Sequence, residues 1–121
     1  MAARYVFGLT FGLETGPDVS LEPNRFETRL IERAVPPGEP GWLFFRDNLW
    51  RGAIADPEHF RSSVEEALDV VVASVDYRAF ETDEDTLEAF REAIADDLSA
   101  FNDDSVDAVL NKYLGASIEV V

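Results

Sequence analysis

Arginine and tryptophan residues between positions 25 and 51 are the side chains best suited to bind a ligand. The arginines of this stretch stand at positions 25, 29, 33, 46 and 51, and the tryptophans at 42 and 50. A guanidinium group binds a carboxylate or phosphate through two parallel hydrogen bonds, and it also stacks on an indole ring. The sequence therefore predicts a binding surface whose candidate residues are Trp42, Arg46, Trp50, Arg51, Arg25 and Arg29.

A structural interpretation of the same residues is also open. In it, Trp50 belongs to the hydrophobic core and Arg51 forms an ion pair with a nearby acid such as Asp47 or Asp56. Solvent exposure separates the two interpretations, because a binding surface needs both side chains to be accessible.

The other residue types that carry chemistry are scarce or badly spaced. The chain has no cysteine, which excludes disulfides, thiolate metal sites and cysteine nucleophiles, and a single histidine, His59, cannot form a multi-histidine site. The N-terminal glycines match no nucleotide-binding fingerprint. The acidic tracts at 83–85 and 103–104 lack the glycine and the distal glutamate of a calcium loop. We therefore predict no catalytic residues, no metal site and no cofactor, and we interpret His59 as an ordinary residue of a helix start.

The balance of charge indicates an environment rich in salt. The 121 residues include 25 acids and 10 basic residues, which gives a net charge of −15, and Lys112 is the only lysine. Such a charge destabilises a compact chain in dilute buffer, whereas at about 1 M salt the Debye length falls to about 3 Å and removes most of the repulsion. Residues 1–53 hold seven acids and six arginines, but residues 54–121 hold eighteen acids and four basic residues. We interpret most carboxylates as solvated surface.

Charge and hydropathy also restrict the partners. Nucleic acid is an unsuitable partner, because binding it requires a cationic surface that displaces phosphate counterions. The apolar stretches are far shorter than the ~20 residues of a membrane helix, and the N-terminus lacks the pattern of a signal peptide. We expect a cytoplasmic protein without membrane contact, whose partner is a second copy or another protein.

The first half of the chain predicts two strands and a short helix. Apolar residues alternate from Tyr5 to Leu13, which is typical of a strand with one buried face. Residues 15–24 are rich in turn formers and predict a loop, and residues 25–34 predict a second strand that pairs with the first in an antiparallel manner. For residues 42–55 we expect an apolar segment that ends in a short helix.

The second half predicts helices and further strands. Asp56 and Pro57 favour a helix start, and the valines at 70–72 favour an end near residue 70. A strand follows at 74–81. Thr82 or Asp83 can cap the next helix, whose buried stripe is Leu87, Phe90, Ile94, Leu98 and Phe101. A third helix is expected from Asp103 or Asp104 to Gly115, with a closing strand at 116–121. Residues 1–121 are thus expected to form one acidic α+β domain: a small mixed or antiparallel sheet of about four strands with two to three helices packed on it.

One block of the sequence resembles a known family. Residues 42–56 read WLFFRDNLWRGAIAD and contain the triplet Leu49-Trp50-Arg51. Together with the opening strand, RFET at 25–28 and DYRAFETDE at 76–84, this block resembles the LWR-salt family of small proteins from halophilic archaea. The resemblance implies a haloarchaeal origin, and it supplies neither an activity nor catalytic residues.

Two functions compete on these observations, and a third is weaker. The first is a non-catalytic binding or protein-interaction module of a halophilic cytoplasm that uses the arginine and tryptophan surface of residues 25–51. The alternative is a small enzyme that acts with carboxylate and arginine side chains on an anionic or polar small molecule, which requires a concave pocket holding both groups. The weaker possibility is a nucleic-acid or ribosome accessory.

Overall fold

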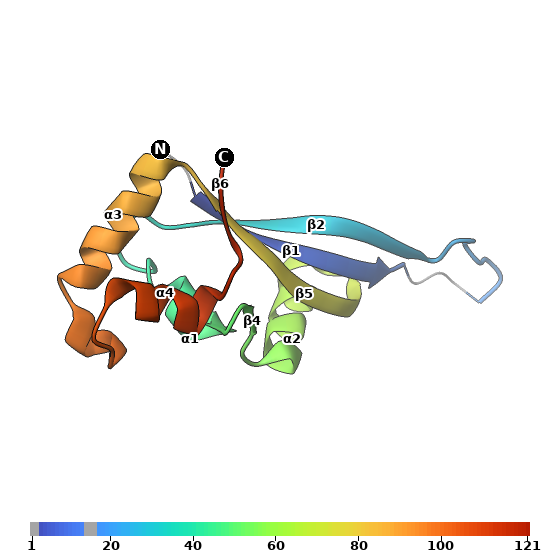
Figure 1. Cartoon of the computed structure of the whole chain (residues 1–121). Helices are drawn as coiled ribbons and strands as arrows, with labels where there is room; N and C mark the ends of the chain where they lie inside the picture. Colours follow the sequence, from blue (N-terminus) through green and yellow to red (C-terminus); the bar gives the residue numbers. More distant parts are fainter. Residues whose placement is uncertain (1–2, 14–16) are drawn as a thin grey trace.

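A four-stranded sheet organises the chain. The computed structural model describes residues 3–13 and 17–121. The strands lie in the order β2-β1-β5-β6, with bounds β1 Ala3–Gly12, β2 Arg25–Arg33, β5 Val71–Thr82 and β6 Ile118–Val120. Strand β1 pairs antiparallel with β2 and β5, whereas β6 runs parallel to β5, so the sheet is mixed (Figure 1).

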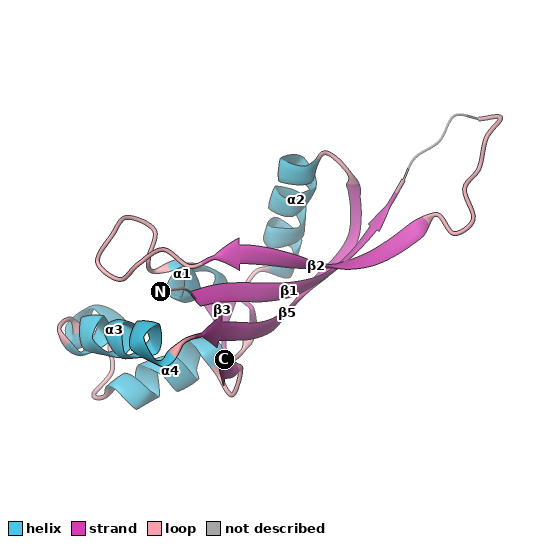
Figure 2. Ribbon diagram, turned by 90° about the horizontal axis from the view of Figure 1, so that it is seen from above, coloured by secondary structure: helices cyan, strands magenta, loops and turns pink. Residues whose placement is uncertain are grey.

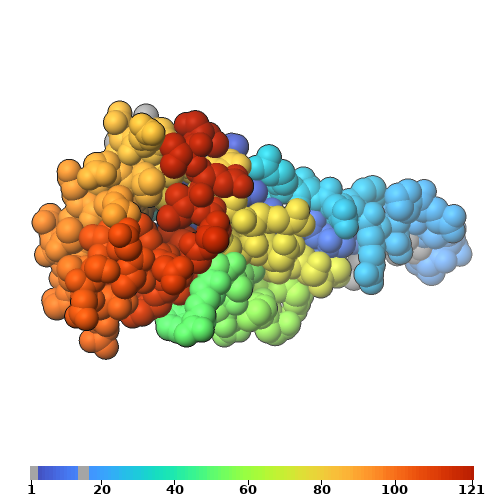
Figure 3. All heavy atoms as spheres, in the orientation of Figure 1, coloured from blue at the N-terminus to red at the C-terminus, as the bar shows by residue number. Residues whose placement is uncertain are grey.

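The helices lie on one side of this sheet and around one of its ends, as Figures 1 and 2 show from two directions. Their bounds are α1 Phe44–Asn48, α2 Pro57–Leu68, α3 Glu84–Ala95 and α4 Val106–Leu114, with a 3₁₀ turn at Leu98–Phe101. The far end of the β1–β2 hairpin, with the described part of its loop, extends beyond the body of the molecule (Figure 3). The α+β class predicted from the sequence is confirmed.

Strand β1 separates the core from the uncovered face of the sheet. Its residues Tyr5, Phe7 and Leu9 are buried beneath the helices, because every second side chain of a strand points to the same side. The core contains many rings, and its fully buried aromatic members are Tyr5, Phe7, Phe45, Phe80, Phe90 and Phe101. The intervening residues of β1 point to the opposite side of the sheet, where no described helix covers them.

The Leu-Trp-Arg block folds into a small hairpin that docks on α4. Strands β3 (Leu49–Trp50) and β4 (Ala53–Ile54) are joined by Arg51 and Gly52, with φ of +52° and +78°, the pattern of a type I′ turn. The N–H of Arg51 donates to the Lys112 carbonyl at 2.7 Å, and the N–H of Gly52 to the Tyr113 carbonyl at 3.0 Å. These carbonyls belong to the last turn of α4 and have no acceptor role inside the helix. The turn therefore caps α4.

Most of the predicted elements are present. The first two strands pair as expected, and the loop predicted at 15–24 lies partly outside the described residues. Helix α2 begins where predicted, because the Asp56 carboxylate accepts from the N–H of His59 at 3.2 Å and Pro57 occupies the first position. Helix α3 is capped by Asp83, one of the two residues expected to cap it, through the N–H of Thr86 at 2.6 Å.

Three details differ from the prediction. The segment 42–55 ends in the β3–β4 hairpin and not in a helix, because the backbone of its turn binds α4. Helix α4 is capped by Ser105, whose hydroxyl accepts from Ala108, while Asp103 forms an ion pair with Lys112 at 2.7 Å. The apolar stripe predicted for one helix is divided, since α3 ends at Ala95 and the 3₁₀ turn carries the rest.

We predict that Gly52→Ala destabilises the protein and that Arg51→Gly does not. A Cβ on Gly52 would lie 3.1 Å from the Leu114 carbonyl oxygen at a backbone angle that favours glycine, at a cost of about 1–3 kcal/mol. Arg51→Gly places glycine at a left-handed backbone conformation that arginine adopts only with strain. The free energy of unfolding of this variant should therefore lie within about 1 kcal/mol of the parent value. Urea unfolding in molar KCl measures both values, and equal midpoints for the two variants would contradict the docking of this turn.

Candidate anion-binding face

The uncovered side of the sheet collects most of the arginines, and we call it the arginine face. It carries five arginines, Arg4, Arg25, Arg29, Arg33 and Arg78, and four acids, Glu27, Asp76, Glu81 and Glu119. The strand register explains this grouping, because alternate residues of β2 lie opposite those residues of β1 that point away from the core. Among these described side chains arginines outnumber acids, although the whole chain has a net charge of −15.

A bulge in β5 adds the fifth arginine. Val6 pairs with Ala79 but Phe7 pairs with Tyr77, so Arg78 is an extra residue in the strand. Its guanidinium group lies directly over Gly8, where any side chain on the glycine would collide with it. The absence of a side chain at Gly8 therefore makes the room that the arginine occupies.

Ion pairs hold some of these guanidinium groups in place. The Nε of Arg4 lies 2.7 Å from Oε1 of Glu81, and Nη2 of Arg29 lies 3.5 Å from Oε2 of the same carboxylate. The Nε of Arg78 lies 2.7 Å from Oδ2 of Asp76, and this hydrogen bond raises the pKa of Arg78. Each of these arginines keeps further N–H donors, because a guanidinium group has five.

Arg25 and Arg33 differ from the other three arginines of the face. Neither makes an ion pair with any of the described residues, in a chain that has 25 acids. Both are exposed at the surface. The arginine face therefore presents cationic groups that are not neutralised within the described structure.

The middle of the arginine face is hollowed. Small side chains, Val6 on β1 and Ala79 on β5, line the hollow together with Arg29, Arg78, Glu81 and Glu119. Its volume is about 310 Å³. Arg29 and Arg78 are the arginines of this lining, and they supply N–H donors to a ligand in the hollow, while both carboxylate oxygens of Glu81 already contact arginines. The hollow can hold a small anionic group.

The structure does not gather the six predicted site residues into one surface. Arg25 and Arg29 lie on the arginine face. Trp42 is half-buried and packs in the core, with ring centroids 6.1–6.3 Å from its neighbours Phe45, Phe90 and Phe101. Arg46 forms an ion pair at 3.1 Å with the adjacent Asp47.

Trp50 and Arg51 form a separate exposed pair beside α4. Trp50 is 47% exposed, its ring centroid lies 5.9 Å from that of Tyr113 in a T-shaped arrangement, and the Arg51 guanidinium lies 5.7 Å from the indole centroid. Arg51 is exposed and pairs with neither Asp47 nor Asp56. The interpretation of Trp50 as a core residue is wrong, and both side chains are accessible to a partner.

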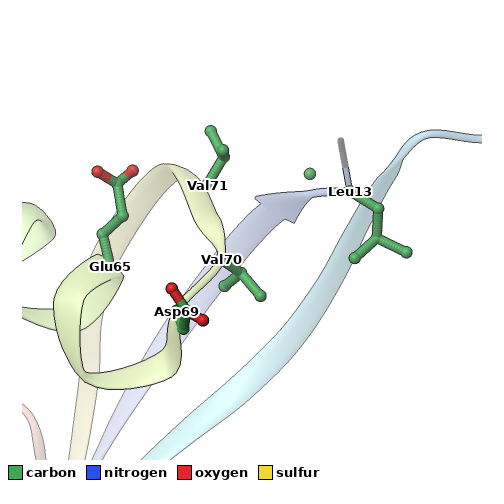
Figure 4. A pocket seen from close by; sticks show the side chains of 6 residues that line it. Leu13, Glu65, Asp69, Val70 and Val71 are labelled. Atoms are coloured by element: carbon green, nitrogen blue, oxygen red, sulfur yellow. The ribbon is translucent and has the colours of Figure 1, made fainter. Parts of the chain in front are cut away.

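A second hollow lies at the C-terminal end of β1, and its charged lining residues are acidic. Its volume is about 440 Å³, and it is lined by Gly12, Leu13, Glu65, Asp69, Val70 and Val71 (Figure 4). Glu65 has a structural task there, since its carboxylate accepts from the N–H of Val72 at 2.9 Å and from Arg61 at 3.1 Å. None of its described lining residues is basic, so the hollow offers an anion no cationic group.

Metal and membrane sites receive no support from the part of the chain that the structure describes. Within residues 3–13 and 17–121, no three histidine or acidic side chains are grouped so that they could hold a metal ion. None of the helices in the same ranges combines the length and the apolar character that crossing a bilayer requires.

Fold and surface together define an α+β domain whose helices cover one face of a mixed sheet and whose other face is lined by arginines. The chain matches the family described as LWR-salt protein over residues 1–121, and it belongs to that family. The resemblance predicted from the block around Leu49-Trp50-Arg51 is thereby confirmed. No curated protein and no solved structure matches the chain.

Proposed function

We propose that this protein is a binding module that holds the anionic groups of a ligand on its arginine face. The observation that carries the proposal is the placement of five arginines on the helix-free side of the sheet, in a chain with a net charge of −15. If these arginines served only to balance the acids, they would be expected among the acids of the helices. Two of them, Arg25 and Arg33, instead have no acid partner in the described structure.

The spacing of the arginines suits a ligand that extends along the sheet. Arg25, Arg29 and Arg33 follow one another at intervals of four residues on one strand, so the Cα atoms of successive members lie about 13 Å apart. Arg29 and Arg78 both line the central hollow. A carboxylate or a phosphate is the group that a guanidinium binds with two hydrogen bonds, and such short contacts persist in salt that screens long-range attraction.

A small enzyme is the second candidate, and the composition of the hollow favours it. The hollow holds carboxylates, Glu81 and Glu119, next to Arg29 and Arg78, the combination that acid–base chemistry on a polar substrate requires. The contacts of Glu81 with Arg4 and Arg29 weigh against it, because they occupy the carboxylate that is most buried. Burial raises the pKa of Tyr77 to about 12 and raises the pKa of Tyr5 as well, so neither hydroxyl is a base near neutral pH.

We infer that the module works in a salt-rich cytoplasm. The net charge of −15 and the use of arginine in nine of ten basic positions support this inference. The acids of α3 and α4 are largely exposed, and the ion pair between Arg91 and Asp107 joins these two helices at 2.8 Å. Dense counterions reduce the repulsion among the remaining carboxylates.

We predict that citrate and inorganic phosphate bind at the arginine face. In a ¹⁵N-labelled sample in molar KCl, the Nε–Hε signals of Arg29 and Arg78 should shift on titration. The double variant Arg29→Gln with Arg78→Gln should bind at least about tenfold more weakly, which corresponds to about 1.4 kcal/mol.

The matched control is the double variant Arg46→Gln with Arg91→Gln, which also removes two arginines that form ion pairs, here half-buried ones that lie off the arginine face. It should bind both anions like the parent. Equal affinities of the two double variants would show that the face has no special role. Tighter binding of a duplex DNA than of citrate would favour a nucleic-acid partner over the proposal.

We predict that the free energy of unfolding rises steadily from dilute buffer to molar KCl. The cause is the shortening of the Debye length from about 30 Å at 0.01 M to about 3 Å at 1 M. Replacing the exposed Glu88 and Glu92 of α3 by glutamine should reduce the size of this gain, because less repulsion is left to screen. A melting temperature that does not change after dialysis into nearly ion-free buffer would disprove the inference.

A further inference from the structure

A third pocket, distinct from the two hollows described above, opens at the rim of the arginine face. It lies where β1 begins and β2 ends, against the N-terminal half of α3, which stands at this end of the sheet in Figure 1. Its volume is about 380 Å³. Sites for small molecules commonly measure about 300–1,000 Å³, so the pocket is large enough for one.

The walls of this pocket are mainly apolar. Ile31, Ala34 and Pro36 line it from the side of β2, and Phe90 lines it from α3. Ile31 is 41% exposed although it is a large apolar side chain. Such walls favour a ligand with an apolar body, because its burial removes apolar surface from water on both sides.

Two arginines stand together at the rim. Arg4 and Arg33 both line the pocket, and they lie directly opposite each other on neighbouring strands. Arg4 contacts Glu81, whereas Arg33 has no ion-pair partner among residues 3–13 and 17–121. Like charges in directly opposed positions destabilise a sheet. An anionic group placed between the two guanidinium groups would remove this repulsion.

A buried hydroxyl supplies an independent observation. Thr86 of α3 also lines the pocket and is only 3% exposed, and its hydroxyl has no hydrogen-bond partner among residues 3–13 and 17–121. A buried hydroxyl without a partner is unfavourable, and folded proteins rarely contain one without a reason. An oxygen of a bound ligand would give this hydroxyl a partner.

We propose that this pocket binds a small molecule that has an apolar body and one anionic head group. The head group, a carboxylate or a phosphate monoester, lies between Arg4 and Arg33, and the apolar body lies against Ile31 and Phe90. The inference rests on the proposed function, since both arginines belong to the arginine face, and it adds the chemical class of the ligand.

The test compares ligands with and without an apolar body by calorimetry in molar KCl. Octanoate and octyl phosphate are compared with acetate and inorganic phosphate. Octanoate is paired with acetate, and octyl phosphate is paired with inorganic phosphate. In at least one pair, we expect the ligand with the eight-carbon chain to bind about 100-fold more tightly than its short counterpart. The stronger of the two octyl compounds identifies the head group. Octyl compounds that bind no more tightly than acetate and phosphate would overturn the proposal.

Two variants and one direct measurement locate the site. Arg33→Gln should weaken binding of the tighter of the two eight-carbon ligands at least about tenfold, whereas Arg46→Gln, which removes an arginine that lies off the arginine face, should leave it unchanged. Ala34→Phe fills the pocket and should abolish binding. Nuclear Overhauser contacts between the alkyl chain of the tighter-binding ligand and the Phe90 ring test the parent protein directly, and their absence at saturation overturns the proposal even if Ala34→Phe does not fold.

This test separates two failures. If citrate shifts the signals of Arg29 and Arg78 while neither octanoate nor octyl phosphate binds better than its short counterpart, the pocket proposal fails and the binding face stands. If no anion binds in either experiment, both fail.

Discussion

The alternation of side chains along β1 is the constraint on which the rest of the structure depends. Tyr5, Phe7 and Leu9 point to the helices and form the centre of the core, so the residues between them must point to the other side. That side carries Val6 and Gly8, which are small, and β2 and β5 place long arginines around them. A one-residue shift of β1 would bury charge and expose the rings. The position of the arginine face is thus a consequence of the core.

The Leu-Trp-Arg triplet connects the two halves of the chain. Leu49 is buried with Phe45 in the aromatic core, while the turn that follows caps α4 through the N–H groups of Arg51 and Gly52. The capping uses only backbone atoms and a positive φ, a geometry that suits glycine or asparagine better than arginine at position 51. Fold stability therefore explains Leu49 and Gly52. It does not explain the exposed Arg51 guanidinium over the Trp50 ring.

Patterns that depend on neighbouring residues were sufficient to predict much of the fold. Alternation predicted β1 and β2, and the Asp56–Pro57 pair predicted the start of α2. The remaining features are set by contacts between distant residues. The bulge at Arg78 leaves no mark in the sequence, the parallel β6 depends on the path of the chain after α4, and Asp103 pairs with Lys112 while Ser105 takes the cap.

The residues of the candidate site can be predicted from the sequence only in part. Arg25 and Arg29 are predicted as part of the arginine- and tryptophan-rich stretch 25–51, and both alternate with apolar residues on one strand. Arg4 shows the same alternation with Tyr5 and Phe7 and was available to that reasoning, whereas Arg78 was not. Trp42 and Trp50 look alike in sequence, and only packing against Phe90 and Phe101 places Trp42 in the core.

A binding surface, unlike a core, can be altered without loss of the fold. The direct measurement is therefore the free energy of unfolding, in molar KCl, of a single variant in which Arg4, Arg25, Arg29, Arg33 and Arg78 are all replaced by glutamine. Ion pairs exposed on both sides, such as Arg78–Asp76, contribute about 0–1 kcal/mol each, whereas Glu81 is only 15% exposed and loses both of its arginines at a cost of up to about 3–5 kcal/mol. The variant should therefore be less stable than the parent but should still fold and unfold cooperatively. A variant that does not fold would show that these arginines support the sheet itself, and it would contradict their assignment to ligand binding.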